Sequence, residues 1–120
     1  MQVNEVKYFD VIPIDSYGPG FFRVGGKIFK GAIVCSGFGV SSWEGYKDFN
    51  SLKNLENKID VLFLGTGHEI CHIPEEFSKT IEKMGLNLEI MNTPSACRTY
   101  NVLLSEGRRI AIAALTVEGR

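Results

Sequence analysis

The order of apolar segments after residue 58 constrains the fold most, because short continuous apolar runs alternate there with helical patterns. Residues 59–64 form an apolar run that ends at Gly65, which is typical of a strand buried on both faces. Residues 86–91 form the next strand pattern, and the centre of the segment 108–117 is continuously apolar. Short joints on either side of a helix favour parallel crossovers, so this order predicts a β-α-β-α-β unit.

Two helices are predicted between these strands. The first opens at Pro74, carries apolar residues at helical spacing, and stops at Gly85. The second is predicted to take Thr93 as its N-cap, with Pro94 at the first helical position, and to run to about Glu106. Both sets of boundaries follow from the residues that helices favour at their ends.

Glycine is concentrated between Gly18 and Gly45, a stretch with eight of the 13 glycines that predicts tight β turns. Residues 21–30 place two β-prone runs on either side of Gly25 and Gly26. Because two adjacent glycines adopt positive φ without strain, this pattern predicts a hairpin with a type I′ turn.

The rest of the first half carries weaker signals. Residues 31–35 are expected to continue the second strand of the hairpin. Residues 11–14 are expected to form an edge strand, because their proline removes a backbone donor. A short helix is expected over residues 47–56.

Charge and composition exclude several classes of function. The 13 Lys and Arg residues and 14 Asp and Glu residues give a net charge of −1, spread evenly along the chain, so nucleic acid is not expected as a partner. Three widely spaced cysteines suit a reducing compartment rather than a disulfide framework. No segment reaches the roughly 20 apolar residues of a membrane span, and the N-terminus resembles neither a signal peptide nor an Arg-rich presequence. A cytoplasmic protein is therefore expected.

The carboxyl ends of the predicted parallel strands are the first candidate site, since parallel sheets bind ligands there. Gly65, Thr66 and Gly67 end the first strand, and the second ends directly before Thr93. If the strands are neighbours, backbone amides, two hydroxyls and a helix N-terminus meet, which suits an anion or a carboxylate. The alternative is that the glycines only turn the chain and Thr93 only caps the helix.

Two residues of the second helix extend this candidate site. Arg98 lies in the second turn, and its planar guanidinium binds carboxylates and phosphates well. Asn101 lies on the same polar stripe, which is otherwise simply a solvated face of the helix.

Cysteine and histidine residues suggest two further kinds of site, a cysteine nucleophile and a metal site, but the sequence does not supply all the residues that either one needs. Cys97, beside Arg98 near a helix N-terminus, would be a nucleophile if its pKa were lowered, although burial is the commoner fate of cysteine. His68, Cys71 and His72 have the spacing of two metal ligands on a turn, but a second matching pair is missing. We therefore expect no metal, no cofactor and no catalytic residue.

The first half of the chain holds more aromatic side chains than one small sheet face buries. Some belong to the core, whereas a surface patch of several would mark a protein-binding face. The candidates for such a face are Tyr17, Phe21 and Trp43.

Several segments of the chain resemble one known family. They are residues 16–22 with the hairpin that follows, Trp43, residues 63–67, and residues 93–103 followed by Glu-Gly-Arg-Arg at 106–109. These segments resemble the small-domain family that includes the mitochondrial complex I assembly factor 3 and many bacterial and archaeal proteins of unknown function.

The resemblance spans about residues 7–117 and implies a compact three-layer α/β domain with a mixed central sheet. This agrees with the single domain that the chain length predicts over residues 1–120. It also agrees with the order of elements predicted from the residues, an N-terminal β-hairpin region followed by β-α-β-α-β. The resemblance also implies that the Gly65-Thr66-Gly67 turn and the helix start from Arg98 to Asn101 are family features. No catalytic activity is established for the family, and its mitochondrial member helps to assemble respiratory complex I by binding proteins.

Two functions are therefore expected. The first is a non-enzymatic binding or assembly factor with a protein partner, such as a subunit of a respiratory complex. The second is a small anionic-ligand-binding protein or enzyme that uses the turn at residues 65–67 and the helix start at residues 93–98. A partner-binding protein needs an exposed aromatic patch, whereas a ligand-binding protein needs a concave polar pocket. The oligomeric state does not follow from the sequence.

Overall fold

A computed structural model describes residues 12–118 of the chain, so residues 7–11 of the expected core and the first residue of the strand expected at 11–14 lie outside the described residues. No helix in the described part is long and apolar enough to cross a membrane. In chain order the elements are β1 (Ile14–Gly18), β2 (Phe21–Val24), β3 (Lys27–Lys30), β4 (Ile33–Ser36), β5 (Gly39–Ser42), α2 (Asn50–Lys53), β6 (Val61–Gly65), α3 (Glu75–Lys83), β7 (Asn87–Met91), α4 (Thr93–Ser105) and β8 (Ile110–Ala114).

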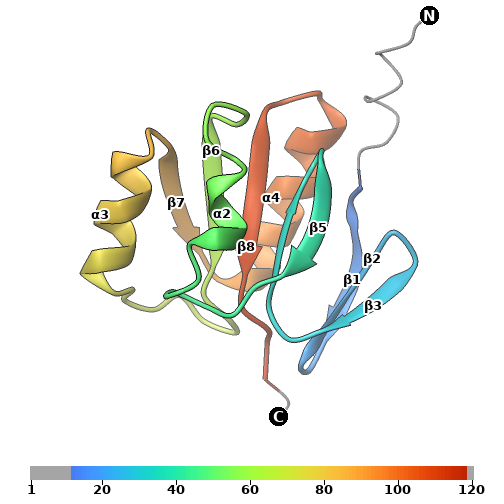
Figure 1. The fold of residues 1–120 in the computed structure, drawn as a ribbon. Coiled ribbons are helices and arrows are strands. Elements are labelled where there is room, and N and C mark those ends of the chain that lie inside the picture. Colours follow the sequence, from blue (N-terminus) through green and yellow to red (C-terminus); the bar gives the residue numbers. More distant parts are fainter. Residues whose placement is uncertain (1–11, 119–120) are drawn as a thin grey trace, which may run out of the picture.

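The central sheet has five strands in the order β5-β4-β8-β6-β7 (Figure 1). Strand β6 runs parallel to both β7 and β8, so the predicted parallel crossovers are confirmed. Strand β4 is antiparallel to β5 and to β8, which makes the sheet mixed. The predicted α/β class with a mixed central sheet is therefore confirmed.

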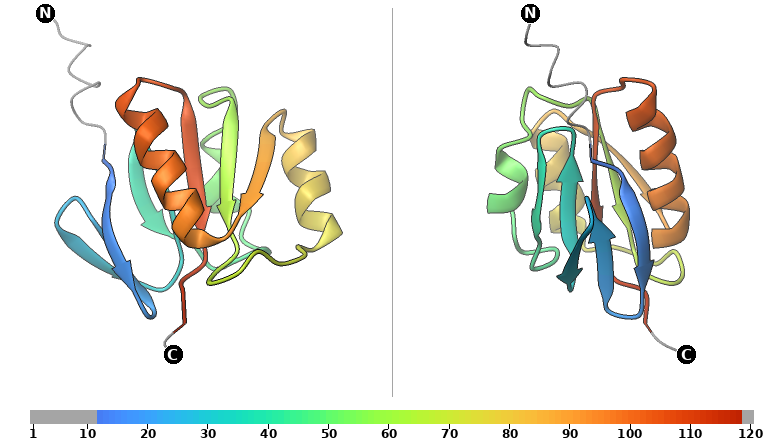
Figure 2. Two further views of the ribbon diagram at one scale, coloured as in Figure 1. Left: turned by 180° about the vertical axis from the view of Figure 1, so that it is seen from behind. Right: turned by 90° about the vertical axis from the view of Figure 1, so that its right-hand side faces the viewer.

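Three layers form the molecule, as the resemblance implied. Helices α2 and α3 cover one face of the central sheet, and α4 covers the other beside the three-stranded sheet β1-β2-β3 (Figure 2). Alternate residues of β8 supply both sides of the core, since Ile112 packs toward α4 whereas Ala111 and Ala113 pack toward α3. This alternation is what the pleat of a strand dictates, and it explains why β8 reads as a continuous apolar run.

The predicted hairpin is confirmed as β2 and β3. Gly25 and Gly26 join the strands with φ angles of 58° and 83°, the positive values that a type I′ turn requires. The Asp15 carboxylate accepts a hydrogen bond from the Gly26 amide at 2.9 Å, which ties the turn to β1.

Residues 31–35 do not continue the hairpin, contrary to the prediction. Gly31, with φ of 88°, turns the chain, and β4 then joins the central sheet instead. The expected edge strand lies later than predicted, as β1, and it is indeed an edge of the smaller sheet. The helix expected over residues 47–56 is reduced to the single turn of α2.

Candidate functional site

The end of β6 and the start of α4, which the sequence predicted to be neighbours, do meet in the structure. Strands β6 and β7 are neighbours, and the turn after β6 lies against the start of α4. The Gly67 amide donates to Thr93 Oγ1 at 2.9 Å, and the Thr93 amide donates to the Gly67 carbonyl at 2.8 Å. Contact is close enough that a Cβ on Gly65 would lie 2.7 Å from Thr93 Oγ1, so only glycine fits there without a shift.

Thr93 has a different role from the one predicted. Asn92, not Thr93, is the N-cap of α4, and its Oδ1 accepts from the Ser95 amide at 2.8 Å. Thr93 is completely buried, and its hydroxyl donates to the Leu115 carbonyl at 2.7 Å while it accepts from Gly67. One side chain therefore joins the ends of β6 and β8 to the start of α4.

The other polar groups of the predicted anion site also bond internally. The Thr66 hydroxyl donates to the Glu69 carbonyl at 2.7 Å, and the Thr66 amide donates to the Met91 carbonyl. The Ala96 amide at the start of α4 donates to the Asn92 carbonyl. These donors therefore already have partners within the protein. We call this junction of the strand ends with α4 the polar staple, and it comprises residues 65–67, Asn92 and Thr93.

Arg98 and Asn101 separate into two environments. Arg98 is exposed, and its Nη2 donates to Ser95 Oγ at 3.2 Å within the same helix. Asn101 is half-buried and faces β1, where its Oδ1 accepts from the Ile14 amide and its Nδ2 donates to the Ile14 carbonyl, both at 2.9 Å. The side-chain amide of Asn101 thus pairs with the edge of β1 as a neighbouring strand would.

Cys97 lies in the core beneath α4. Burial raises the pKa of its thiol to about 12, so the thiol stays protonated at neutral pH rather than becoming a nucleophile. Cys35 lies nearby with a pKa raised to about 11 by burial, and its Sγ is 3.3 Å from the Tyr100 hydroxyl. The Tyr100 hydroxyl donates to the Ile12 carbonyl at 3.2 Å, and this bond fixes the start of the small sheet against α4.

His68, Cys71 and His72 lie on the exposed loop after β6. The Cys71 thiol donates to the Glu69 carbonyl at 3.3 Å. Within residues 12–118, no three side chains of His, Cys, Asp or Glu gather in a way that could hold a metal ion.

The three aromatic residues proposed as a partner face do not form one surface. Trp43 is only 3% exposed, packs against Phe77, and donates from Nε1 to the Asp48 carbonyl at 3.0 Å. Burial of Trp43 removes it from any partner face. Tyr17 and Phe21 are half-buried in the small sheet, and Phe21 lines a hollow of about 350 Å³ with Ile28.

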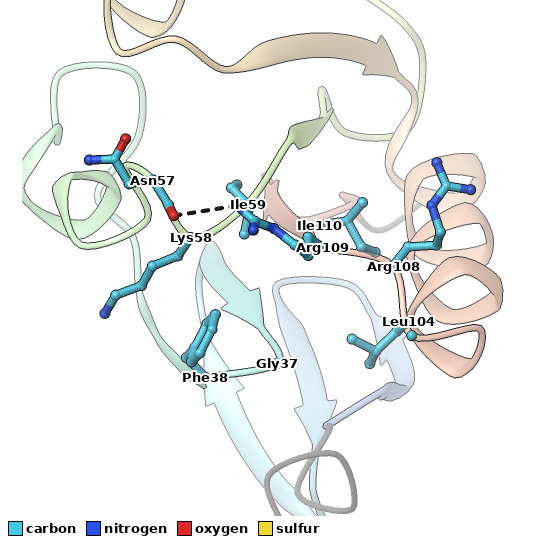
Figure 3. Close-up of a pocket in the computed structure, with 10 residues that line it drawn as sticks. Gly37, Phe38, Asn57, Lys58, Ile59, Leu104, Arg108, Arg109 and Ile110 are labelled. Carbon is cyan, nitrogen blue, oxygen red and sulfur yellow. Dashed lines mark hydrogen bonds between the residues drawn. The ribbon is translucent and has the colours of Figure 1, made fainter. Parts of the chain in front are cut away.

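A further hollow, which the sequence did not indicate, lies at the opposite end of the central sheet from the polar staple. We call it the Phe38 groove, and it has a volume of about 370 Å³. Figure 3 shows the residues that line it, which come from four places in the chain. They are Gly37 and Phe38 of the β4–β5 turn, residues 57–59 before β6, Leu104 of α4, and residues 107–110 leading into β8.

Phe38 is the most exposed large apolar side chain among those described, at 66% of its surface. It lies in the two-residue turn that closes the Ser36–Gly39 pair, and its amide donates to Ser36 Oγ at 3.0 Å. Lys58 Nζ lies 5.3 Å from the centre of the Phe38 ring. Residue type alone cannot distinguish an exposed phenylalanine from a buried one, so this site could not be found in the sequence.

These features define a class of protein, a small three-layer α/β domain with a mixed sheet, an internally bonded polar staple and a separate apolar groove. Solved structures share this fold. A crystal structure described as an outer membrane protein from Bartonella henselae has a TM-score of 0.80 at 33% identity and covers 90% of this chain and 97% of that chain. A Bordetella pertussis protein described as an Mth938-like domain has a TM-score of 0.73 at 25% identity, over 96% of this chain and 90% of that chain.

The chain belongs to the family described as Protein of unknown function (DUF498/DUF598), which matches residues 14–115. An uncharacterized protein of Rhodobacter capsulatus is 40% identical over 119 residues, which are 99% of this chain and 96% of that protein. NADH dehydrogenase (ubiquinone) 1 alpha subcomplex assembly factor 3 of Danio rerio is 35% identical over 85% of this chain and 62% of that protein. The human assembly factor 3 is 27% identical over 88% of this chain and 61% of its own length. The resemblance drawn from the sequence is confirmed, and the chain spans about three fifths of the length of these assembly factors.

Proposed function

We propose that this chain is a non-enzymatic assembly factor that binds protein subunits of a respiratory complex. Its similarity to NADH dehydrogenase assembly factor 3 carries the proposal, at 35% identity over 109 residues for the Danio rerio protein. The similarity covers the folded domain rather than a short motif, since the family matches residues 14–115. An assembly-factor-like role for this domain is therefore supported, and the respiratory complex as its client is our proposal.

The chemistry of the two candidate sites supports a binding role over catalysis. The donors at the Gly65–Gly67 turn and at the start of α4 already bond to oxygen atoms of the protein, so an incoming anion would have to displace these hydrogen bonds. The Cys97 thiol is held protonated by burial. By contrast, Phe38 places an apolar ring in solvent, and such rings are typical anchors of protein interfaces.

Deletion of the gene tests this proposal in an organism that encodes both this chain and a respiratory NADH dehydrogenase. We expect membranes of the deletion strain to lose most of the assembled enzyme and to accumulate its subassemblies, because an assembly factor acts before the complex is complete. Native gel electrophoresis and NADH oxidation by isolated membranes measure the two effects. A tagged chain is also expected to co-purify with newly made subunits of that enzyme.

Re-expression of the wild-type chain is the first control and should restore the complex. A Lys83→Glu variant, altered at an exposed position of α3, should restore it equally well. Normal amounts of assembled enzyme in the deletion strain, with none of its subunits bound to the tagged chain, would refute the proposal.

A further inference from the structure

We propose that the Phe38 groove binds an acidic segment of a partner protein, which inserts one large apolar side chain between Phe38 and Leu104. The inference rests on the proposed function, because it assigns the surface and the chemistry through which an assembly factor of this kind would hold its client. It concerns residues outside the polar staple and outside the aromatic set predicted from the sequence.

The floor and the lip of the groove are apolar. Ile59, Leu104 and Ile110 line it, and each is nearly completely buried from solvent by the fold behind it. Phe38 forms the lip, lies in the two-residue turn between β4 and β5, and is 66% exposed. Covering this ring with an apolar side chain removes it from water, which favours binding. The volume of about 370 Å³ suits one large side chain and its neighbours.

The rim of the groove carries basic side chains. Lys58, Arg108 and Arg109 line the groove, and none of its lining residues is acidic, although the chain as a whole has a net charge of −1. Arg109 is partly neutralised, since its Nη2 lies 3.7 Å from Asp60 Oδ1. The same nitrogen donates to the Asn57 carbonyl, a hydrogen bond shown in Figure 3. Lys58 and Arg108 form no ion pair within residues 12–118. A partner with Asp or Glu beside its apolar anchor would complement these charges.

An extended segment fits this surface better than a compact molecule. A second hollow of about 200 Å³ lies on the other side of Phe38 and Lys58, which line both hollows. It continues along Val40 and Ser41 of β5, an edge strand of the central sheet. A polypeptide that crosses the Phe38–Lys58 pair would contact both hollows. A second copy of this chain is disfavoured as the occupant, because a symmetric pairing of the groove would bring like charges together.

Selection from a random heptapeptide phage library on the purified full chain tests the proposal. We expect enriched peptides to carry a large apolar residue flanked by Asp or Glu. A synthetic peptide of the selected sequence, followed by fluorescence anisotropy, should bind at least about tenfold more weakly to Phe38→Ser, as expected for loss of an interface anchor. The double variant Lys58→Glu and Arg108→Glu should weaken it similarly, and added salt should weaken binding to the wild type.

Matched variants separate the groove from the rest of the surface. Val102→Ser removes another exposed apolar side chain, on α4, and Lys27→Glu with Lys83→Glu reverses two exposed charges elsewhere. Both controls should bind the peptide like the wild type. The inference is overturned if selection yields no peptide, if the peptides lack acidic residues, or if binding survives Phe38→Ser. Dimerisation of the wild type that is lost in Phe38→Ser, measured by sedimentation, would assign the groove to a second copy and also overturn it.

Failure of this inference is distinguishable from failure of the proposed function. If the deletion strain loses its NADH dehydrogenase but Phe38→Ser restores it fully, the assembly role stands and the groove is not the binding surface. If the acidic peptides bind the groove but the deletion strain assembles the enzyme normally, the groove stands and its client is a different protein.

Discussion

At the scale of single residues, Thr93 shows how one hydroxyl can join three segments. It accepts from the Gly67 amide and donates to the Leu115 carbonyl while the side chain is fully buried. Thr93→Val keeps the shape but leaves both backbone groups without their partner, so we expect a loss of about 2–4 kcal/mol in the free energy of unfolding. Urea denaturation measures it. Thr99→Val on the same helix removes only a contact to the Met91 sulfur at 3.8 Å and should cost about 1 kcal/mol or less. Equal losses in the two variants would contradict the role given to Thr93.

The buried thiol of Cys97 should make the stability of the protein depend on pH in the alkaline range. Its pKa rises from an ordinary 9.0 to about 12 in the folded state, because burial disfavours the thiolate. Below pH 9 both states hold the proton, and the full stability is present. Between pH 9 and about 12 the unfolded chain releases its proton and the folded chain does not, so stability falls as pH rises.

The measurement is the free energy of unfolding as a function of pH above 9, compared between the wild type and Cys97→Ala. The variant should lose stability less steeply, because one of the buried thiols that create the slope has gone. Cys71→Ala, at an exposed position, should follow the wild-type slope. A Cys97→Ala slope equal to that of the wild type would show that this thiol ionises alike in both states.

At the scale of elements, the pairing of Asn101 with β1 makes α4 the support of the small sheet. Asn101→Asp removes the Nδ2 donor and places a carboxylate against the Ile14 carbonyl, which repels it. We expect a loss of about 1.5–3 kcal/mol in stability and faster hydrogen exchange of the β1 and β2 amides, while β6 and β8 keep their protection. Asn54→Asp makes the same chemical change at an exposed position and should leave exchange in the small sheet unchanged. Uniform exchange across both sheets in Asn101→Asp would contradict this local role.

The elements also show which parts of the fold were accessible from sequence. Strands β6, β7 and β8 and helices α3 and α4 were predicted to within a few residues, because apolar runs of fixed period end at glycine or proline. Residues 31–35 were predicted to continue the second strand of the hairpin, because a run of apolar residues does not show where one strand ends and the next begins. The turn at Gly31 ends β3, and β4 then pairs within the central sheet.

The candidate sites, like the elements, could be predicted from the sequence only in part. Strand order alone was enough to bring the Gly65–Gly67 turn to Thr93, as the sequence predicted. Whether those donors stay free for a ligand depends on differences of a few tenths of an ångström in donor–acceptor distances, which the spacing of residues in the sequence does not reveal. Trp43 and Phe38 are both aromatic residues among turns and short strands, yet one is 3% exposed and the other 66%. Their difference follows from the tertiary packing and not from their neighbours in sequence.

At the scale of the whole molecule, the central sheet couples two hydrophobic clusters into one cooperative unit. Cys97 belongs to the cluster on the α4 side, Trp43 belongs to the cluster on the α3 side, and adjacent residues of β8 enter both. Loss of either cluster therefore exposes one face of the same strands, so we expect the two clusters to unfold in a single transition. Trp43 fluorescence and pulse labelling of the Cys97 thiol in a Cys35→Ala, Cys71→Ala background should give the same urea midpoint. A separate, lower midpoint for Cys97 labelling would show that α4 and the small sheet open while the α3 side stays folded, and the domain would then be two units rather than one.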